Sequence, residues 1–78
     1  MTAWLRAHPQ DTVATALCDL APGAQVADIV TWEPIAAGHK VALVAHTPGD
    51  PVIKLGHPIG RAGAAIPAGV HVHTHNLA

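Results

Sequence analysis

The stretch Ile35-Ala36-Ala37-Gly38-His39-Lys40-Val41 returns later in the chain as Ile66-Pro67-Ala68-Gly69-Val70-His71-Val72. The two segments share Ile, Ala, Gly and Val at matching places. In each, the Gly can adopt the positive φ of a tight turn before the chain enters a strand. The repeat therefore predicts two similar turn-to-strand units that pack near each other.

Turn-forming residues recur through the rest of the chain. Gly and Pro recur at short intervals between runs rich in Val, Ile and Leu, a pattern typical of several short strands and not of long helices. We expect strands at residues 13–17, 26–31, 40–46, 51–55 and 70–75. The predicted fold class is all-β, with short strands joined by Gly/Pro turns. The first segment stays open, because Asp11 could also cap a helix that Pro22-Gly23 ends.

Length and composition bound the fold further. The 78 residues predict a single domain over residues 1–78, and only 3% of them are aromatic, so its core must be aliphatic. So short a chain buries only about 60% of the surface its unfolded form exposes, which favours added stability from a metal or a partner, and of the two we expect association with a partner. Cys18 is the single cysteine; we predict a small core residue in a reducing, cytoplasmic setting. Trp4 and Trp32 are predicted to be packing or interface anchors.

Charge and hydropathy exclude two classes of partner. Four Lys plus Arg and a net charge of −1 leave no basic face for nucleic acid. No apolar run approaches the roughly 18 residues of a membrane span. We therefore expect neither nucleic acid nor a membrane as a partner.

The C-terminal run Val70-His71-Val72-His73-Thr74-His75-Asn76 holds three of the seven histidines. In a strand, side chains alternate between faces, so His71, His73 and His75 would point the same way. Alternate residues lie about 6–7 Å apart on that face, so one ion would take two of the imidazoles. We predict that all three are catalytic and that His71 and His73 bind a metal. The alternative is a row of solvated polar residues.

Two lysines stand at strand ends beside histidines. Gly38-His39-Lys40 precedes the most apolar strand, and a Lys and His at such a position could clamp a carboxylate. Lys54 and His57 stand in a similar segment near Gly56. An ordinary solvated lysine is the alternative in both places.

Several motifs in combination resemble a known family. They are Asp11-Thr12-Val13-Ala14, Gly38-His39-Lys40-Val41-Ala42-Leu43, Val52-Ile53-Lys54-Leu55-Gly56 with Ile59-Gly60, and His71-Val72-His73-Thr74-His75-Asn76-Leu77. Their order and spacing resemble the small SAF-type (β-clip) domain of the altronate/galactarate dehydratase family, which is also similar to the small subunit of sulfolactate sulfo-lyase. The resemblance covers the chain from about residue 8 to its end.

The resemblance implies a function as well as a β-clip fold. It implies an accessory subunit of a carbon–oxygen lyase that eliminates water, or sulfite, from a sugar acid or related 2-hydroxy acid. The subunit would be inactive alone, beside a larger catalytic subunit with which it shares a divalent metal, iron or manganese. The residues expected to face the shared site are His39, Lys40, Lys54 and Asn76, as substrate ligands, together with His71, His73 and His75.

The chain departs from the family pattern at Thr12, at Leu55 and over residues 61–65, where the family commonly has Asn, an aromatic residue and a polar Thr-then-Asp arrangement. These departures leave two further hypotheses open. One is a non-enzymatic SAF-type binding module. The other is a homo-oligomeric metal-binding protein in which the histidine row meets its symmetry mate.

Overall fold

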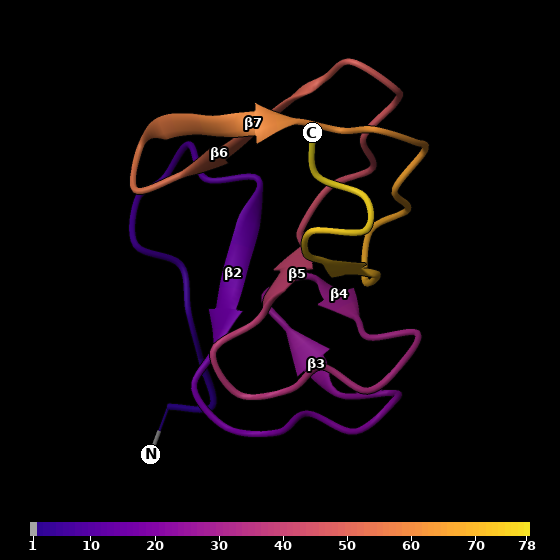
Figure 1. The fold of residues 1–78 in the computed structure, drawn as a ribbon. Helices are drawn as coiled ribbons and strands as arrows, with labels where there is room; N and C mark the ends of the chain where they lie inside the picture. Colours follow the sequence, from indigo (N-terminus) through magenta and orange to yellow (C-terminus); the bar gives the residue numbers. More distant parts are fainter. Residues whose placement is uncertain (1) are drawn as a thin grey trace.

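The computed structural model describes residues 2–78, which contain eight short strands and no helix (Figure 1). The strands are β1 Trp4–Leu5, β2 Val13–Ala16, β3 Gln25–Val26, β4 Ile29–Val30, β5 Lys40–Ala42, β6 Pro51–Lys54, β7 His57–Arg61 and β8 His71–Val72. The all-β prediction is therefore confirmed. Nothing in residues 2–78 forms a helix that could cross a membrane.

Three antiparallel sheets make up the fold. The main sheet has the order β1-β2-β5-β8, and two separate hairpins pair β3 with β4 and β6 with β7. The segment that could have been a helix is β2, whose Ala14 pairs with Val41 of β5. Three of its four side chains are buried, so packing on both faces decides between the two interpretations.

The predicted strand at residues 26–31 is instead the β3–β4 hairpin. Val26 pairs with Ile29, and Ala27 takes a positive φ of 51° that lets the chain reverse there. The apolar run was long enough for one strand, and it lacks the Gly that would signal this turn.

The β6–β7 hairpin confirms the predicted strand at residues 51–55 and adds a partner that sequence reasoning missed. Leu55 and Gly56 both have positive φ, 56° and 75°, as a two-residue type I′ turn requires. The missed strand β7 contains Pro58 and Gly60, which both weaken a strand signal. Figure 1 shows the C-terminus beside the end of β7, where Arg61 and Ala78 exchange backbone hydrogen bonds of 2.9 and 2.7 Å.

The repeated turn-to-strand unit is confirmed. The N–H of Gly38 donates to the carbonyl of Ala16, and that of Gly69 to the carbonyl of Ala42, both at 2.8 Å. The two glycines have φ values of 85° and 93°. Each turn feeds a strand, β5 or β8, and these two strands pair with each other.

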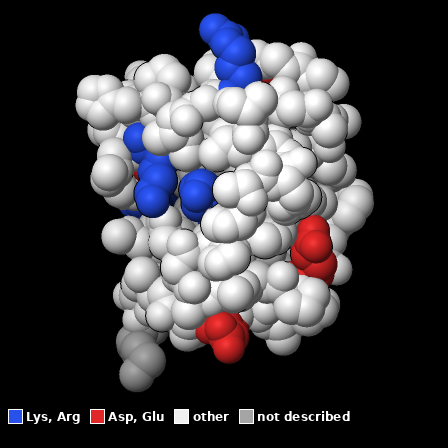
Figure 2. Space-filling view, in the orientation of Figure 1, with Lys and Arg blue, Asp and Glu red and all other residues white. Residues whose placement is uncertain are grey.

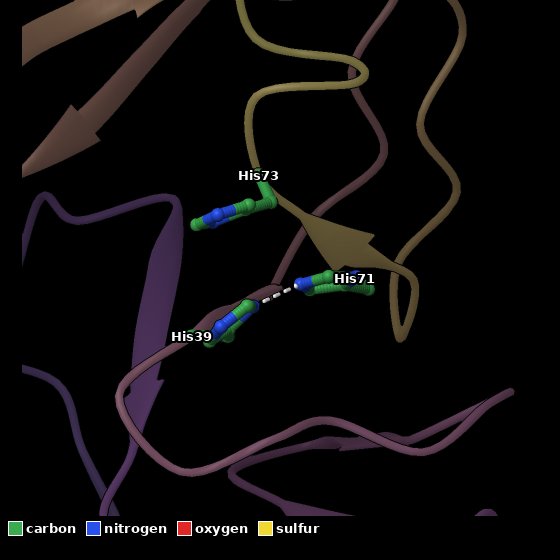
Figure 3. Close-up of side chains that lie close together, drawn as sticks. All are labelled: His39, His71 and His73. Carbon is green, nitrogen blue, oxygen red and sulfur yellow. Dashed lines mark hydrogen bonds between the residues drawn. The ribbon is translucent and has the colours of Figure 1, made fainter.

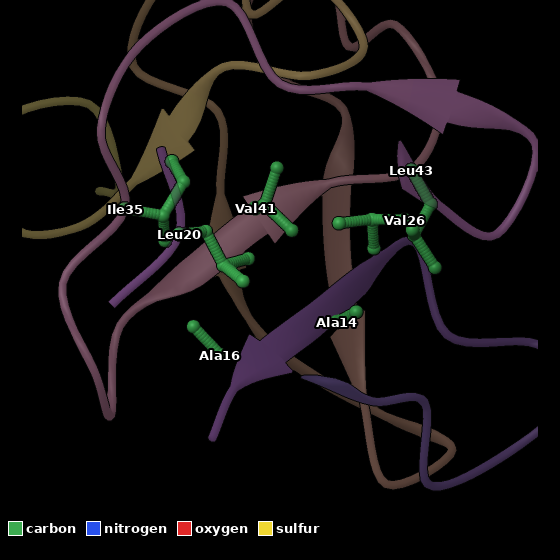
Figure 4. Packing of buried hydrophobic residues seen from close by; sticks show 7 residues of the cluster. All are labelled: Ala14, Ala16, Leu20, Val26, Ile35, Val41 and Leu43. Atoms are coloured by element: carbon green, nitrogen blue, oxygen red, sulfur yellow. The ribbon is translucent and has the colours of Figure 1, made fainter. Parts of the chain in front are cut away.

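Two aliphatic clusters form the core, one on each side of the main sheet. The first contains Ala14, Ala16, Leu20, Val26, Ile35, Val41 and Leu43 (Figure 4). The second contains Val13, Ala42, Val52, Ala62, Ile66 and Val72. Consecutive strand residues fall in opposite clusters, as the alternation of side chains in a strand requires.

Three predictions need correction. Cys18 is exposed, because β2 ends at Ala16 and the chain bends outward there. The strand predicted to reach His46 ends at Ala42. The strand predicted at residues 70–75 contains only His71 and Val72, since the chain turns at residue 73. Of the two Trp residues, Trp4 packs against the first cluster, whereas Trp32 is 65% exposed.

Candidate functional site

Three half-buried histidines converge where β5 and β8 meet: His39, His71 and His73 (Figure 3). One ring nitrogen from each lies within 4.8 Å of the others. Nδ1 of His39 and Nε2 of His71 are 2.7 Å apart and share one proton. The ring of His39 also stacks on that of His73, with centroids 4.1 Å apart. We call these three residues the histidine cluster.

The strand register explains the histidine cluster. Lys40 pairs with Val72 and Val41 with His71, so one further step along both chains sets His39 opposite His73. Opposite residues of an antiparallel pair project to the same face of the sheet. The sequence had assigned His39 to substrate binding, and nothing in the spacing of the chain connected it with the C-terminal run.

The turn after β8 sets the third residue of the predicted row apart. The amides of Asn76 and Leu77 donate to the carbonyl of His73, which ends the extended conformation. His75 is exposed, and although its ring centroid lies 5.2 Å from that of His71, it is not part of the histidine cluster. The prediction that the three histidines lie in one straight row along a strand is therefore wrong. The catalytic role of His75 stays a prediction.

Asn76 and Glu33 hold the backbone of the histidine cluster in place. The side-chain oxygen of Asn76 accepts from the amide of His73 at 3.0 Å, and its NH₂ group donates to the carbonyl of His71 at 2.8 Å. A carboxylate oxygen of Glu33 accepts from the amide of His71 at 3.2 Å. The sequence did not predict this role of Glu33, because Glu33 lies in a loop far from His71 along the chain and no residue spacing indicates the contact.

The electrostatics of the histidine cluster favour neutral imidazoles. Burial lowers the pKa of His71 below its ordinary 6.5, and the neighbouring His39 and His75 lower it further, against the opposing charge of Glu33. Burial, His39 and Lys40 likewise lower the pKa of His73. Both rings are therefore uncharged at neutral pH, the form that binds metals and accepts protons.

Lys40 is near both Lys54 and His73. Burial, followed by the charge of Lys54, lowers the pKa of Lys40, so the two ammonium groups are close enough to interact. Lys40 also acts on the pKa of His73. Figure 2 shows one group of basic side chains at the left of the visible face and another apart from it at the top, with the prominent acidic groups to the right and below. Such a cationic surface suits a carboxylate. His57, by contrast, is exposed in β7 and is not part of the histidine cluster.

The site is open on the surface of the described chain. Residues 2–78 enclose no pocket, so a ligand there would be covered on one side only. Nδ1 of His73 is buried and has no hydrogen-bond partner among the described residues. The arrangement offers neutral nitrogen ligands or bases beside two cations. It can bind an acid, a metal ion or both, provided that something else forms the second wall.

Comparison with known proteins identifies the family of the chain. The family model of the altronate/galactarate dehydratase SAF domain matches residues 2–78. Altronate dehydratase of Escherichia coli (strain K12) is 47% identical over 77 residues, and altronate dehydratase of Bacillus subtilis (strain 168) is 36% identical over 80 residues. The subunit alpha of (2R)-sulfolactate sulfo-lyase from Paracoccus pantotrophus is 52% identical over 42 residues.

The coverage of these matches differs between the two kinds of relative. The aligned regions include 94% and 97% of this chain but only 16% of each altronate dehydratase. For the sulfo-lyase subunit they include 54% of this chain and 63% of the relative. The chain thus spans about a sixth of the length of the dehydratases it matches.

Proposed function

The chain belongs to the altronate/galactarate dehydratase SAF domain family, and on that premise we propose that it supplies part of the substrate site of a lyase. The proposed reaction eliminates water, or sulfite, from a sugar acid or related 2-hydroxy acid. The observation that carries the proposal is the convergence of the three histidines on an open surface, with Lys40 near enough to lower the pKa of His73.

Each part of the site has a task in such an elimination. Lys40 and Lys54, which are close enough to interact, are proposed to bind the substrate carboxylate as cations. A neutral imidazole of the histidine cluster is suited to accept the proton next to that carboxylate. His75 and Asn76 are proposed to complete the contacts, His75 in catalysis and Asn76 in substrate binding.

A larger catalytic polypeptide is the proposed partner. Residues 2–78 enclose no pocket, and an elimination needs its intermediate shielded from water. The dehydratase relatives are much longer than this chain, which supports a larger partner surface across the site. We propose that the chain acts as an accessory subunit without activity of its own, in the cytoplasm, where a single free thiol stays reduced.

A divalent metal, iron or manganese, is the proposed cofactor, shared with that partner. The donor set fits a metal, because a ring nitrogen from each of three histidines converges, and Nδ1 of His73 is buried without a partner among the described residues. His71 and His73 are the proposed ligands. A bound metal would supply a Lewis acid that stabilises the negative charge developing on the substrate.

The test is co-purification followed by reconstitution. The tagged chain is captured from its native host, and the complex is assayed for elimination from hydroxy acids with added Fe²⁺ or Mn²⁺. We expect one larger protein at fixed stoichiometry and activity only in the complex. In that complex, Lys40→Met should raise KM at least about tenfold, as expected when a charged contact to substrate is lost. Arg61→Met, at an exposed position in β7, is the control.

Two outcomes contradict the proposal. Recovery of the chain alone, without activity in any metal, leaves the binding module or the homo-oligomeric metal-binding protein as the better account. An equal effect of Lys40→Met and Arg61→Met on KM would remove Lys40 from the substrate site.

A further inference from the structure

We propose that His39, His71 and His73 together form a complete three-nitrogen metal site within this chain, selective for Fe²⁺, Co²⁺, Ni²⁺ or Zn²⁺ over Mn²⁺ and Mg²⁺. The inference adds His39 as the third ligand and narrows the class of metal. It rests on the proposed function for the use of the metal, and it leaves His75, not a member of the histidine cluster, to accept the substrate proton. Binding of the metal can be measured without any activity.

The distances already approach those of a metal centre. An imidazole nitrogen lies about 2.0–2.1 Å from a bound Zn²⁺, so two ligand nitrogens of one ion are about 3.0–3.5 Å apart. Nδ1 of His39 and Nε2 of His71 are 2.7 Å apart around a shared proton. The ligand atom of His73 lies within 4.8 Å of both. Small side-chain rotations would let one cation replace the proton and bring in the third nitrogen.

A second observation points to a missing ligand. Nδ1 of His73 is buried and has no partner among the described residues, although buried polar atoms in folded proteins nearly always have one. His39 and His71 pair one ring nitrogen each, whereas His73 takes no part in that hydrogen bond. A cation at the centre of the histidine cluster would satisfy all three rings at once.

Hydrogen bonds hold the backbone of His71 and His73 in place without a bound metal. His71 lies in β8, paired with Val41, and its amide is held by Glu33. Asn76 fixes both the carbonyl of His71 and the amide of His73. A backbone fixed in this way loses less conformational freedom when the side chains bind a metal.

The donor set decides the class of metal. The group contains imidazoles alone, and the nearby carboxylate of Glu33 accepts from the amide of His71. Imidazole nitrogen suits Fe, Ni, Cu and Zn, whereas Mg and Mn prefer oxygen ligands. A three-histidine site therefore discriminates against Mn²⁺, and of the two metals proposed above it selects iron.

The experiment is metal titration of the full 78-residue chain, without substrate or partner. Co²⁺ is added while its visible absorption is recorded, and Zn²⁺, Fe²⁺, Mn²⁺ and Mg²⁺ are then used as competitors. We expect one Co²⁺ per chain, displacement by Zn²⁺, displacement by Fe²⁺ only when Fe²⁺ is in excess, and at least about 100-fold weaker competition by Mn²⁺ and Mg²⁺ than by Zn²⁺. Calorimetry of Zn²⁺ binding gives the affinity independently.

Variants assign the ligands. His39→Ala, His71→Ala and His73→Ala should each weaken Zn²⁺ binding at least about 100-fold, more than the usual loss for an outer-shell group. His75→Ala and His57→Ala are matched controls that should change it by less than about threefold. If a variant fails to fold, NMR of the unmodified chain serves instead: Zn²⁺ should shift the imidazole signals of the histidine cluster and leave that of His57 unchanged.

Several results would overturn the inference. They are binding no tighter than millimolar, two chains per ion, an effect of His75→Ala as large as that of His39→Ala, or equal competition by Mn²⁺. Tight binding without lyase activity in any complex would sustain the metal site and remove the proposed function. Activity in a complex whose small chain binds no metal alone would do the reverse.

Discussion

The two repeats of this chain, residues 16–41 and 42–72, share one hydrogen-bonded skeleton and differ in what they carry on it. In each, a bridge closes the base of a hairpin, Leu20 with Ile35 in the first repeat and His46 with Ile66 in the second. Three backbone hydrogen bonds of the first repeat have equivalents in the second. In the first repeat they join Ala16 to His39, Gly38 to Ala16 and Gly23 to Thr31. In the second they join Ala42 to Val70, Gly69 to Ala42 and Gly49 to Ala62, in the same order. The skeleton therefore tolerates different side chains at equivalent positions.

The main difference lies in the hairpins and at their base. The first repeat has the two-residue strands β3 and β4, whereas the second has the longer β6 and β7. At the base, the apolar Leu20 corresponds to His46, which is 3% exposed and contacts Oγ1 of Thr12 through Nε2 at 2.9 Å. The second repeat thus buries a polar group where the first buries a hydrocarbon.

The repeats meet at the histidine cluster. Lys40 and Val41 of the first repeat correspond to His71 and Val72 of the second, and these strands pair as Lys40–Val72 and Val41–His71. Exchanging equivalent residues maps this pairing onto itself, so β5 and β8 are related by a local two-fold axis. The site therefore lies where the two copies contact each other, and His39 stands in it where the second repeat has Val70.

The largest expected effect comes from replacing the glycines of the two turns, which should affect stability unequally. Gly38 and Gly69 both have positive φ, but a Cβ on Gly38 would meet nothing within 4 Å. A Cβ on Gly69 would overlap the carbonyl oxygen of Val30 and come within 3.0 Å of Trp32. We expect Gly69→Ala to cost about 3–5 kcal/mol of unfolding free energy, from backbone strain plus overlap, and Gly38→Ala about 1–2 kcal/mol from strain alone. Urea denaturation of both variants measures the difference, and equal losses would show that the two turns are equivalent after all.

A swap at the hairpin bases sharpens the comparison. Leu20→His places a polar ring in the first cluster, and we expect a loss of about 2–4 kcal/mol in the free energy of unfolding. His46→Leu removes the buried Nδ1 that has no partner among the described residues, while Thr12 keeps its bond from the amide of Ile53. That change should therefore stay within about 1 kcal/mol of the original stability. A large loss from His46→Leu in urea denaturation would mean that the pair with Thr12 is a main support of the second repeat.

The comparison of the repeats also shows which turns could be predicted from the sequence. The turn pattern at Ile35 and Ile66 predicted two equivalent units, because Gly and a following apolar run act locally. The β3–β4 turn was not predicted, because Ala27 adopts a conformation that its side chain does not favour.

The site was predicted only in part for a similar reason. His71 and His73 are near in sequence and were grouped correctly, whereas His39 joins them through strand pairing and Glu33 through a loop contact. Contacts between distant segments depend on the register of β5 with β8, which local pattern does not determine.

A third comparison concerns how each hairpin is attached to the rest of the chain. The buried carboxylate of Asp11 accepts from the amide of Gly56 at 2.8 Å and from that of His8 at 3.1 Å, which fixes the tip of the second hairpin. Burial alone would raise its pKa, but the amides of Gly56, Leu55 and His8 outweigh this and hold the pKa below 3.8. At the tip of the first hairpin, Asp28 is exposed.

Asp11→Ala should therefore lower the free energy of unfolding by about 1.5–3 kcal/mol at pH 7, as expected for lost hydrogen bonds to a charged group. A carboxyl whose pKa is lowered on folding stabilises the folded state above its unfolded pKa, and this contribution is lost as the pH falls through the folded value. The difference between the original chain and Asp11→Ala should accordingly be full at pH 7 and 5 and shrink below about pH 4. Urea denaturation at pH 7, 5 and 3 checks this, with Asp28→Ala as the matched change in the first hairpin. A difference that stays constant over that range would mean that the side chain of Asp11 acts through packing and not through its charge.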